Sequence, residues 1–216
     1  MKKTLRENLA FLIPYLYFLF FAGIILSLYQ KADIHLFINQ YRSDFFDVFF
    51  YYTTYLGDGI AVTVLALLLC LVKYRYAVIV GLCNIIAAII TQTLKHTIFS
   101  DQVRPKKYFE GIANLNLIPG VENYYYNSFP SGHTTAAFST FFCLALITEN
   151  RLLKFLMFVL AFLIGFSRVY LSQHFLNDVY AGSLIGTTAS LFIYQYCFLS
   201  EKIKGLSWLE KSILKK

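Results

Sequence analysis

Six apolar runs limit the fold of this chain more than any other feature. A bilayer core about 30 Å thick is crossed by a helix of roughly 20 apolar residues. The runs lie at 8–29, 58–72, 76–94, 132–148, 152–171 and 178–199. In lipid the backbone polar groups must pair within the chain, and helices achieve this. The sequence therefore predicts an all-α, polytopic membrane helical bundle with about six transmembrane helices.

Two segments near the start of the chain are harder to assign. The run at 58–72 is short for a span, and the aromatic stretch 45–56 before it either extends the helix or lies along the membrane interface. Apolar residues at helical spacing over 34–45 predict an amphipathic helix on the outer membrane surface. His35 lies in that segment and His96 follows the third run, and we expect both side chains to be interfacial or solvated.

The composition excludes several classes of protein. The chain has 216 residues, 58% hydrophobic and 14% charged, so we expect residues 1–216 to form a single membrane-embedded domain. Its formal net charge of +7 is not arranged as a soluble basic face, so no nucleic-acid partner is expected. The four cysteines lie inside apolar runs without paired spacing, which predicts neither a zinc site nor disulfides.

Polar residues at the edges of the apolar runs are suited to phosphate chemistry. His174 and Asp178 are four residues apart, which places them on one face of a helix. A carboxylate that accepts the proton of one imidazole nitrogen leaves the lone pair of the other nitrogen free to attack phosphorus. Taken alone, the pair fits a helix cap with a polar contact equally well.

Arginine and helix-start residues add features expected of an anion site. A charge such as Arg168 in an apolar run costs on the order of 2.5–3.5 kcal/mol at the bilayer centre and less near its edge. It therefore favours a nearby anion, and the alternative is snorkelling to the headgroups. Ser131 and Gly132 begin the run at 132–148, where unpaired helix amides suit an anion. Ser131 can also be a helix N-cap, and the two roles are compatible.

The polar segments follow one another in a set order: Lys95 with Arg104-Pro105, then Pro130 to His133, then Ser167-Arg168 with His174 and Asp178. This order resembles the type 2 phosphatidic acid phosphatase superfamily. Its signatures are Lys-x6-Arg-Pro, Pro-Ser-Gly-His and Ser-Arg-x5-His-x3-Asp. The second and third signatures match in full, whereas eight residues rather than six separate Lys95 from Arg104. The resemblance spans roughly residues 95–178.

The resemblance implies an integral membrane phosphatase that hydrolyses a lipid phosphate or lipid diphosphate monoester through a phosphohistidine. It implies His174 as the nucleophile, Asp178 as its partner and His133 as the proton donor to the leaving group. The phosphate contacts that it implies are Lys95, Arg104, Ser131, Gly132 and Arg168. No metal or other cofactor is expected. The lipid stays open among undecaprenyl diphosphate, phosphatidylglycerol phosphate, phosphatidic acid and lipid A.

Two other classes of protein stay open. A non-enzymatic lipid or anion transporter also has several helices with charges at their edges. It does not need His133, His174 and Asp178 together. Vanadium-dependent haloperoxidases hold vanadate with a similar set of residues, but those known are soluble. Phosphate release would separate a phosphatase from a transporter, and bromide oxidation would identify a haloperoxidase.

The spacing of Lys95 and Arg104 predicts a break in the third helix. In an unbroken helix, nine positions turn the chain by about 900° and place the two cations on opposite faces. Ser100-Asp101 favours a turn, because both side chains compete for backbone hydrogen bonds. We therefore predict that the helix ends near Phe99 and that the turn folds Arg104 back toward Lys95. Otherwise the lysine role belongs to one of the two lysines after Pro105.

Cationic loops predict the orientation, because Lys and Arg are enriched in short loops on the cytoplasmic side. These residues are Lys2, Lys3, Arg6, Lys73, Arg75, Arg151, Lys154, Lys202, Lys204, Lys211, Lys215 and Lys216. With six spans they all fall on one side, and the three polar segments fall on the other. The pattern predicts an integral protein of a bacterial cytoplasmic membrane whose site faces the periplasmic or extracytoplasmic side.

Overall fold

The protein is all-helical over residues 1–200, 203 and 205–214, the part described by this computed structural model. The α-helices are α1 (Lys2–Glu7), α2 (Leu9–Leu28), α3 (Lys31–Gln40), α4 (Asp44–Thr53), α5 (Gly59–Val72), α6 (Tyr74–Thr97), α7 (Pro105–Tyr108), α8 (Gly132–Ile147), α9 (Arg151–Tyr170) and α10 (Leu176–Ile193). Shorter helical turns are η1 (Thr54–Gly57), η2 (Tyr194–Phe198) and η3 (Ser207–Glu210). The predicted all-α fold is confirmed.

The six apolar runs correspond to α2, α5, α6, α8, α9 and α10. By length and composition, α2, α6 and α9 can each cross a membrane. The aromatic stretch before α5 forms α4 and η1, and this segment meets α5 at a bend of 59°, so the pair can count as a fourth, broken span. Membrane-spanning helices are therefore present in the described residues, and the total of six stays a prediction.

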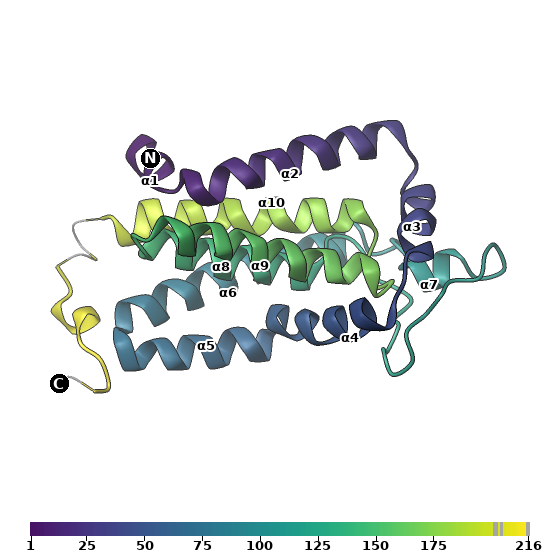
Figure 1. The fold of residues 1–216 in the computed structure, drawn as a ribbon. Helices are drawn as coiled ribbons and strands as arrows, with labels where there is room; N and C mark the ends of the chain where they lie inside the picture. Colours follow the sequence, from purple (N-terminus) through teal and green to yellow (C-terminus); the bar gives the residue numbers. More distant parts are fainter. Residues whose placement is uncertain (201–202, 204, 215–216) are drawn as a thin grey trace.

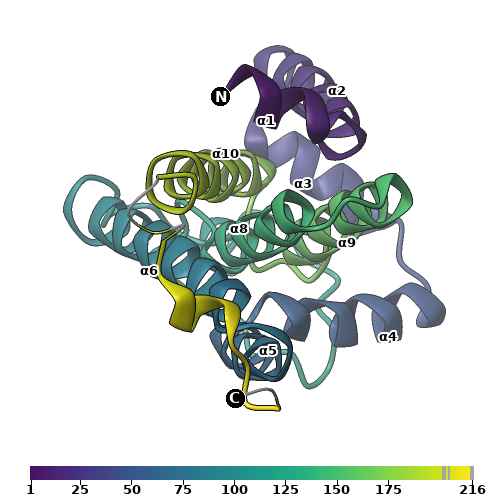
Figure 2. The same ribbon diagram turned by 90° about the vertical axis from the view of Figure 1, so that its left-hand side faces the viewer.

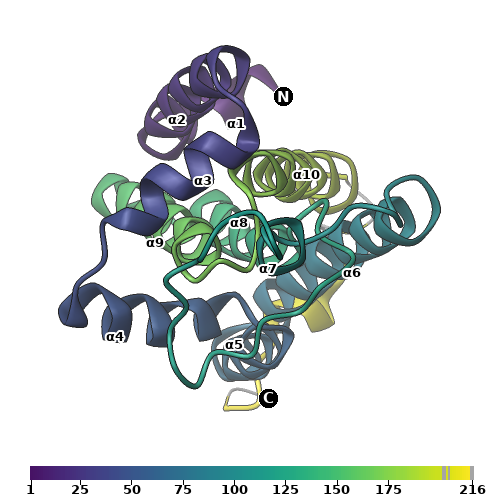
Figure 3. The same ribbon diagram turned by 90° about the vertical axis from the view of Figure 1, so that its right-hand side faces the viewer.

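The bundle is built around α8, which packs most extensively against α10, α9 and α6. Viewed from its ends, α2 lies outside α9 and α10, and α5 lies on the opposite side beside α6 (Figures 2 and 3). The N-terminus and the α5–α6 and α8–α9 turns lie at one end of the bundle, here called the cationic end (Figure 1). At the other end, the motif end, lie α3, α7 and the loop that precedes α8.

Polar side chains fix where four of the helices begin. Ser43, Asp58, Ser131 and Asn150 each accept a hydrogen bond from a first-turn amide of α4, α5, α8 and α9, at 3.1–3.4 Å. A cap of this kind contributes about 1 kcal/mol to helix stability, because it satisfies an amide that has no partner within the helix. Ser131 therefore starts α8 at the motif end, where the second signature lies.

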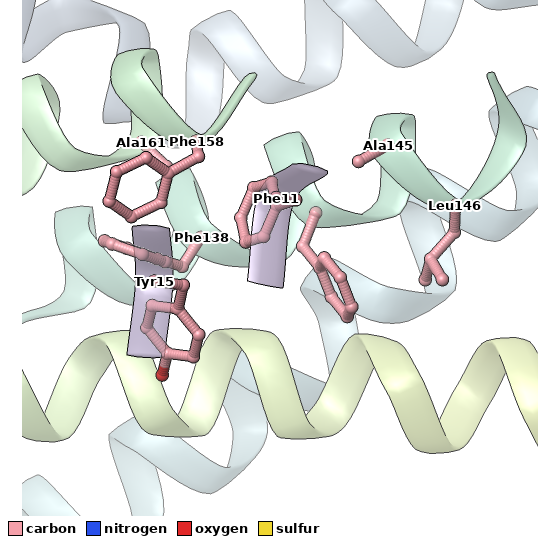
Figure 4. Packing of buried hydrophobic residues seen from close by; sticks show 8 residues of the cluster. Phe11, Tyr15, Phe138, Ala145, Leu146, Phe158 and Ala161 are labelled. Carbon is pink, nitrogen blue, oxygen red and sulfur yellow. The ribbon is translucent and has the colours of Figure 1, made fainter. Parts of the chain in front are cut away.

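Aromatic side chains join α2 to the bundle (Figure 4). Phe11 lies against Phe142 of α8 and Phe158 of α9, with ring centroids 4.8 and 5.7 Å apart. Tyr15, one turn further, packs on Phe138 at 5.4 Å. Such ring pairs add about 0.5–1.5 kcal/mol each beyond the area that they bury. In lipid, where helix association depends on close packing, these contacts hold the first helix in place.

Small residues bring α10 very close to α8. A Cβ atom at Gly182 would lie 2.7 Å from the Ser131 carbonyl oxygen, and one at Gly186 would lie 2.8 Å from the Ser139 amide nitrogen. One turn further, the Ser190 hydroxyl donates to the Ser139 carbonyl at 3.0 Å. The small residues of α10 thus serve close helix packing. This packing sets the position of the first residues of α10 relative to the start of α8.

Candidate active site

All the predicted site residues lie at the motif end, where segments distant in sequence meet beside the loop between α7 and α8 (Figure 3). The electrostatic neighbours of His174 are Lys95, Arg104, Arg168 and His133. Lys95 lies at the end of α6, Arg104 directly before α7, His133 at the start of α8 and Arg168 at the end of α9. The structure therefore brings the three sequence segments into one buried cluster.

His174 and Asp178 form a buried pair. The His174 Nδ1 atom lies 3.2 Å from Asp178 Oδ2, and the two residues are 1% and 2% exposed. The same carboxylate oxygen accepts from the Ser128 hydroxyl at 2.5 Å and from the Phe175 amide at 3.1 Å. With the carboxylate as acceptor, Nδ1 carries the proton and the lone pair stays on Nε2.

The surroundings of His174 favour its neutral form. The residue lies in the turn between α9 and α10, outside the helices. Burial, together with the charges of Arg104, Arg168 and Lys95, holds the pKa of His174 well below its ordinary value. A neutral imidazole keeps a lone pair, so the environment maintains the form that can act as a nucleophile or a base.

Arg168 lies in the last turn of α9 and is buried among polar partners. One terminal nitrogen donates to the Thr54 hydroxyl at 2.7 Å, and the other donates to Gln173 Oε1 at 3.3 Å. Its Nε is buried without a hydrogen-bond partner among the described residues. A buried unpaired donor on a cation is costly, and an anion in the cluster would satisfy it.

Arg104, the residue before α7, reaches the same place. Its Nε donates to the Tyr126 carbonyl at 3.0 Å, and its guanidinium lies over the Tyr124 ring at 5.3 Å from the centroid. One terminal nitrogen donates to Gln173 Oε1 at 3.3 Å. Gln173 therefore connects Arg104 with Arg168. The two arginines approach one another from different segments, as expected for groups that hold one phosphate.

The Ser131 amide is not free to bind phosphate. Its N–H donates to the Asp178 carbonyl at 3.0 Å, and its hydroxyl accepts from the Thr134 amide at 3.4 Å. The first turn of α10 thus already occupies this donor, and phosphate binding by Ser131 stays a prediction. The Gly132 and His133 amides are the next in the first turn of α8, where amides have no acceptor within the helix. An anion at this helix end would lie on those two amides.

His133 lies beside the cationic cluster and against η1. A Cβ at Gly57 would lie 3.0 Å from the His133 carbonyl oxygen and 3.5 Å from its Cβ, so the absence of a side chain at Gly57 allows this contact. The electrostatic neighbours of His133 include Arg168, Asp58 and Arg104. His133 itself is half-buried.

The predicted break after the third apolar helix is confirmed. α6 ends at Thr97, and the Ile98 and Phe99 amides both donate to the Leu94 carbonyl, at 3.1 and 2.9 Å. Lys95 is 7% exposed, and its electrostatic neighbours are Arg104, Asp178 and Arg168. The turn therefore brings Lys95 into the cluster despite its eight-residue spacing from Arg104.

The two lysines after Pro105 make other contacts. Lys107 pairs with Glu110 at 2.5 Å, and Lys106 lies over the Tyr125 ring at 5.2 Å from its centroid. The structure thus favours Lys95 over either of them as the lysine of the site.

His35 is buried, so the expectation that it is interfacial or solvated is wrong. It is 1% exposed, lies between the Phe109 and Phe175 rings, and its Nε2 is 3.1 Å from the Ser172 hydroxyl. Asn39, one turn further along α3, donates to the same hydroxyl at 3.2 Å. α3 therefore holds the turn that carries His174. His96 is exposed, as expected.

Three polar residues of the site were not found from the sequence. Ser128 contacts Asp178, Thr54 contacts Arg168, and Gln173 contacts both arginines. Ser128 lies two residues before the second signature and Gln173 lies inside the third, a signal that could have marked them, whereas Thr54 has no such signal. No group of three or more His, Cys, Asp or Glu side chains among the described residues could hold a metal ion.

Known proteins share the sequence and fold of this chain. An 86-residue segment is 37% identical to the bacitracin transport permease protein BcrC of Bacillus licheniformis, and it covers 40% of each chain. The chain is 27% identical over 184 residues to lipid A 4'-phosphatase of Bacteroides thetaiotaomicron, covering 80% of this chain and 77% of that protein. The crystal structure of Aquifex aeolicus LpxE matches with a TM-score of 0.68 at 30% identity, covering 76% of this chain and 94% of that one.

The family model of the PAP2 superfamily matches residues 76–202, which is more than half of the chain. This segment contains all three signatures and all the predicted site residues. Thr54, which contacts Arg168, lies outside it. The chain therefore belongs to the PAP2 superfamily.

Proposed function

We propose that this protein is an integral membrane phosphatase that hydrolyses a lipid phosphate or lipid diphosphate. The observation that carries the proposal is an excess of positive charge that is buried at Lys95 and Arg168 and half-buried at Arg104. Lys95, Arg104 and Arg168 lie together with Asp178, whose carboxylate is already engaged by His174. Such a cluster favours an anion of high charge, and a phosphate ester carries two negative charges at neutral pH.

Family membership supports the enzyme class, a phosphoric monoester hydrolase, because the PAP2 superfamily includes lipid phosphatases. The long apolar helices support a lipid-borne substrate at a membrane. The choice among undecaprenyl diphosphate, phosphatidylglycerol phosphate, phosphatidic acid and lipid A is left to the assay.

The proposed reaction has two steps, and each conserves its protons. His174 Nε2 attacks phosphorus while the bond from phosphorus to the lipid oxygen breaks, and protonated His133 gives its proton to that oxygen. Lys95, Arg104, Arg168 and the first amides of α8 stabilise the charge on the other phosphate oxygens. Water then attacks the phosphohistidine, His133 takes a proton from it, and the bond from phosphorus to nitrogen breaks. Phosphate leaves, and His174 is neutral again.

The site is proposed to face the outside of a bacterial cytoplasmic membrane. The cationic end, with Lys73, Arg75, Arg151 and Lys154, is the end that the positive-inside rule retains in the cytoplasm. Lys106→Cys would report the opposite end. A thiol reagent that cannot cross membranes should label it from outside intact cells, and labelling only after the cells are opened would overturn this orientation.

Phosphate release from the four lipids by purified protein in detergent tests the activity. We expect release from at least one lipid, and loss of nearly all release in His174→Ala. Asp178→Asn should keep the fold and lose most of the rate, because the tautomer of His174 is no longer fixed. Release at the wild-type rate by His174→Ala would overturn the mechanism.

A transporter is the second candidate, because BcrC of Bacillus licheniformis is named a transport permease. Proteoliposomes loaded with each lipid separate the two functions. Movement of lipid without phosphate release, unchanged in His174→Ala, would favour the transporter.

A further inference from the structure

Gln173 occupies a buried position between the two arginines of the site. Its Oε1 accepts from a terminal nitrogen of Arg104 and from one of Arg168, each at 3.3 Å, and the residue is 2% exposed. Its Nε2 donates to the Glu122 carbonyl at 2.9 Å and to Asn123 Oδ1 at 2.8 Å. The two acceptors beside Nε2 fix which way the amide points, so the oxygen faces the arginines.

A neutral acceptor suits this position better than a charged one. Two guanidinium groups repel each other, and an oxygen between them offsets the repulsion by accepting from both. A carboxylate would attract them more strongly, but it would also cancel positive charge that a phosphate needs. The amide holds the pair together and leaves the net charge of the cluster unchanged. It also leaves Arg168 Nε unpaired.

We propose that Gln173 is a positioning residue that sets the spacing of Arg104 and Arg168 around the substrate phosphate. The inference rests on the proposed phosphatase function. Gln173 acts through its neighbours, because its own polar atoms are all engaged by the arginines and by residues 122 and 123. It therefore shapes an anion site without contacting the anion.

Two substitutions separate positioning from simple packing. Both substitutions remove the Nε2 donor to Glu122 and Asn123, so a comparison of the two variants isolates the effect at the arginines. Gln173→Glu keeps the shape of the side chain and adds one negative charge between the arginines. Gln173→Met keeps a similar volume and the charge of the cluster but removes the shared acceptor. Gln40→Glu is the matched control, because Gln40 is exposed at the end of α3 and takes the same added charge outside the cluster.

The assay measures phosphate release and competitive inhibition by orthovanadate, with melting in detergent as the check on folding. We expect Gln173→Glu to raise the inhibition constant for vanadate and KM by roughly tenfold or more, because the added carboxylate competes with the anion for charge-assisted hydrogen bonds from the arginines. Gln173→Met should lower kcat more than it raises KM, because the cations remain but are misplaced. Gln40→Glu should match the wild type in all three measurements.

The outcomes distinguish this inference from the proposed function. Absence of phosphate release by both the wild type and Gln40→Glu, from all four lipids, means that the proposed function fails. An active wild type, with folded Gln173→Glu and Gln173→Met at wild-type kcat, KM and vanadate inhibition, overturns the role of Gln173. If Gln173→Glu does not fold, Gln173→Met decides alone, and wild-type kinetics in that variant overturn the inference.

Discussion

Replacing Gly182 by alanine should displace the start of α10. We expect a large loss in the rate of phosphate release and a smaller relative loss in the stability of the fold. The added Cβ would lie 2.7 Å from the Ser131 carbonyl oxygen and 3.2 Å from Thr134 Cβ. Ordinary contacts begin near 3.4 Å, so the backbones must separate by about 0.7 Å. Asp178 lies one turn earlier on α10, and its carbonyl accepts from the Ser131 amide at 3.0 Å. That hydrogen bond should therefore lengthen.

The expected sizes follow from these distances. Overpacking of this kind costs about 1–3 kcal/mol of stability, and a misplacement of about 1 Å at a catalytic group can cost roughly 100-fold in rate. We expect Gly182→Ala to lose on the order of 10- to 100-fold in kcat, because Asp178 shifts away from His174. The Cβ added in Gly186→Ala would meet the α8 backbone one turn further from the site. This variant should lose at least as much stability as Gly182→Ala but less activity.

Gly81→Ala on α6 is the matched control, since among the described residues no atom beyond its chain neighbours and the nearby backbone of its own helix lies within 4 Å of a Cβ there. This change should leave activity unaltered and raise helix stability by up to about 1 kcal/mol. Thermal melting in detergent and phosphate release, measured on all three variants, check the ranking. Wild-type kcat and melting temperature in Gly182→Ala would refute the reasoning, because α10 would then not be held at its closest approach to α8.

Three further outcomes are expected. The kcat/KM profile should keep its plateau as pH falls through 6.5 and decline only below it, because the lowered pKa of His174 preserves its neutral form; a midpoint at 6.5 or above would contradict this. Burial lowers the pKa of His35 to about 4, so between pH 6.5 and 4 the unfolded chain binds a proton that the folded chain does not. The free energy of unfolding should therefore fall by up to about 3 kcal/mol over this range. His35→Phe should reduce this loss, as measured by melting curves. Lys95→Ala should lower kcat/KM substantially, whereas Lys107→Ala should not, and the reverse result in the same assay would move the lysine role to the segment after Pro105.

The helices were predictable because local patterns determine them. The apolar run at 132–148 corresponds to the helix Gly132–Ile147, and the run at 152–171 corresponds to the helix Arg151–Tyr170. A cap residue, Ser131 or Asn150, stands directly before each helix. The turn after α6 was predicted at the right place, and it is closed by the Ile98 and Phe99 amides, which both donate to the Leu94 carbonyl.

The contacts of α3 were not predictable in this way. Helical spacing over 34–45 indicated an amphipathic helix, but α3 ends at Gln40, and residue 45 belongs to α4. The spacing also could not show that His35 and Asn39 meet Ser172, which is more than 130 residues away in sequence. Nor could the spacing show that the Ser131 amide donates to the Asp178 carbonyl, because that acceptor belongs to α10.

The geometry gives a physical reason for both spacings in the third signature. The Gln173 and His174 amides donate to the Arg168 carbonyl at 2.9 and 3.0 Å, so five intervening residues form one closed turn at the end of α9. Ser172 takes a left-handed φ of 54° within that turn. Phe175 is the residue before α10, and its amide donates to Oδ2 of Asp178, three residues further along the chain.

Backbone hydrogen bonds therefore fix His174 relative to Arg168. The first turn of α10 fixes Asp178 relative to His174. One more or one fewer residue in either interval would change the direction in which the imidazole points relative to the guanidinium. Loop residues are ordinarily mobile, yet this turn is buried and held by α3 on one side and by residues 122 and 123 on the other. A catalytic group in such a turn can be as well positioned as one on a helix, because the hydrogen bonds at both ends leave it few alternatives.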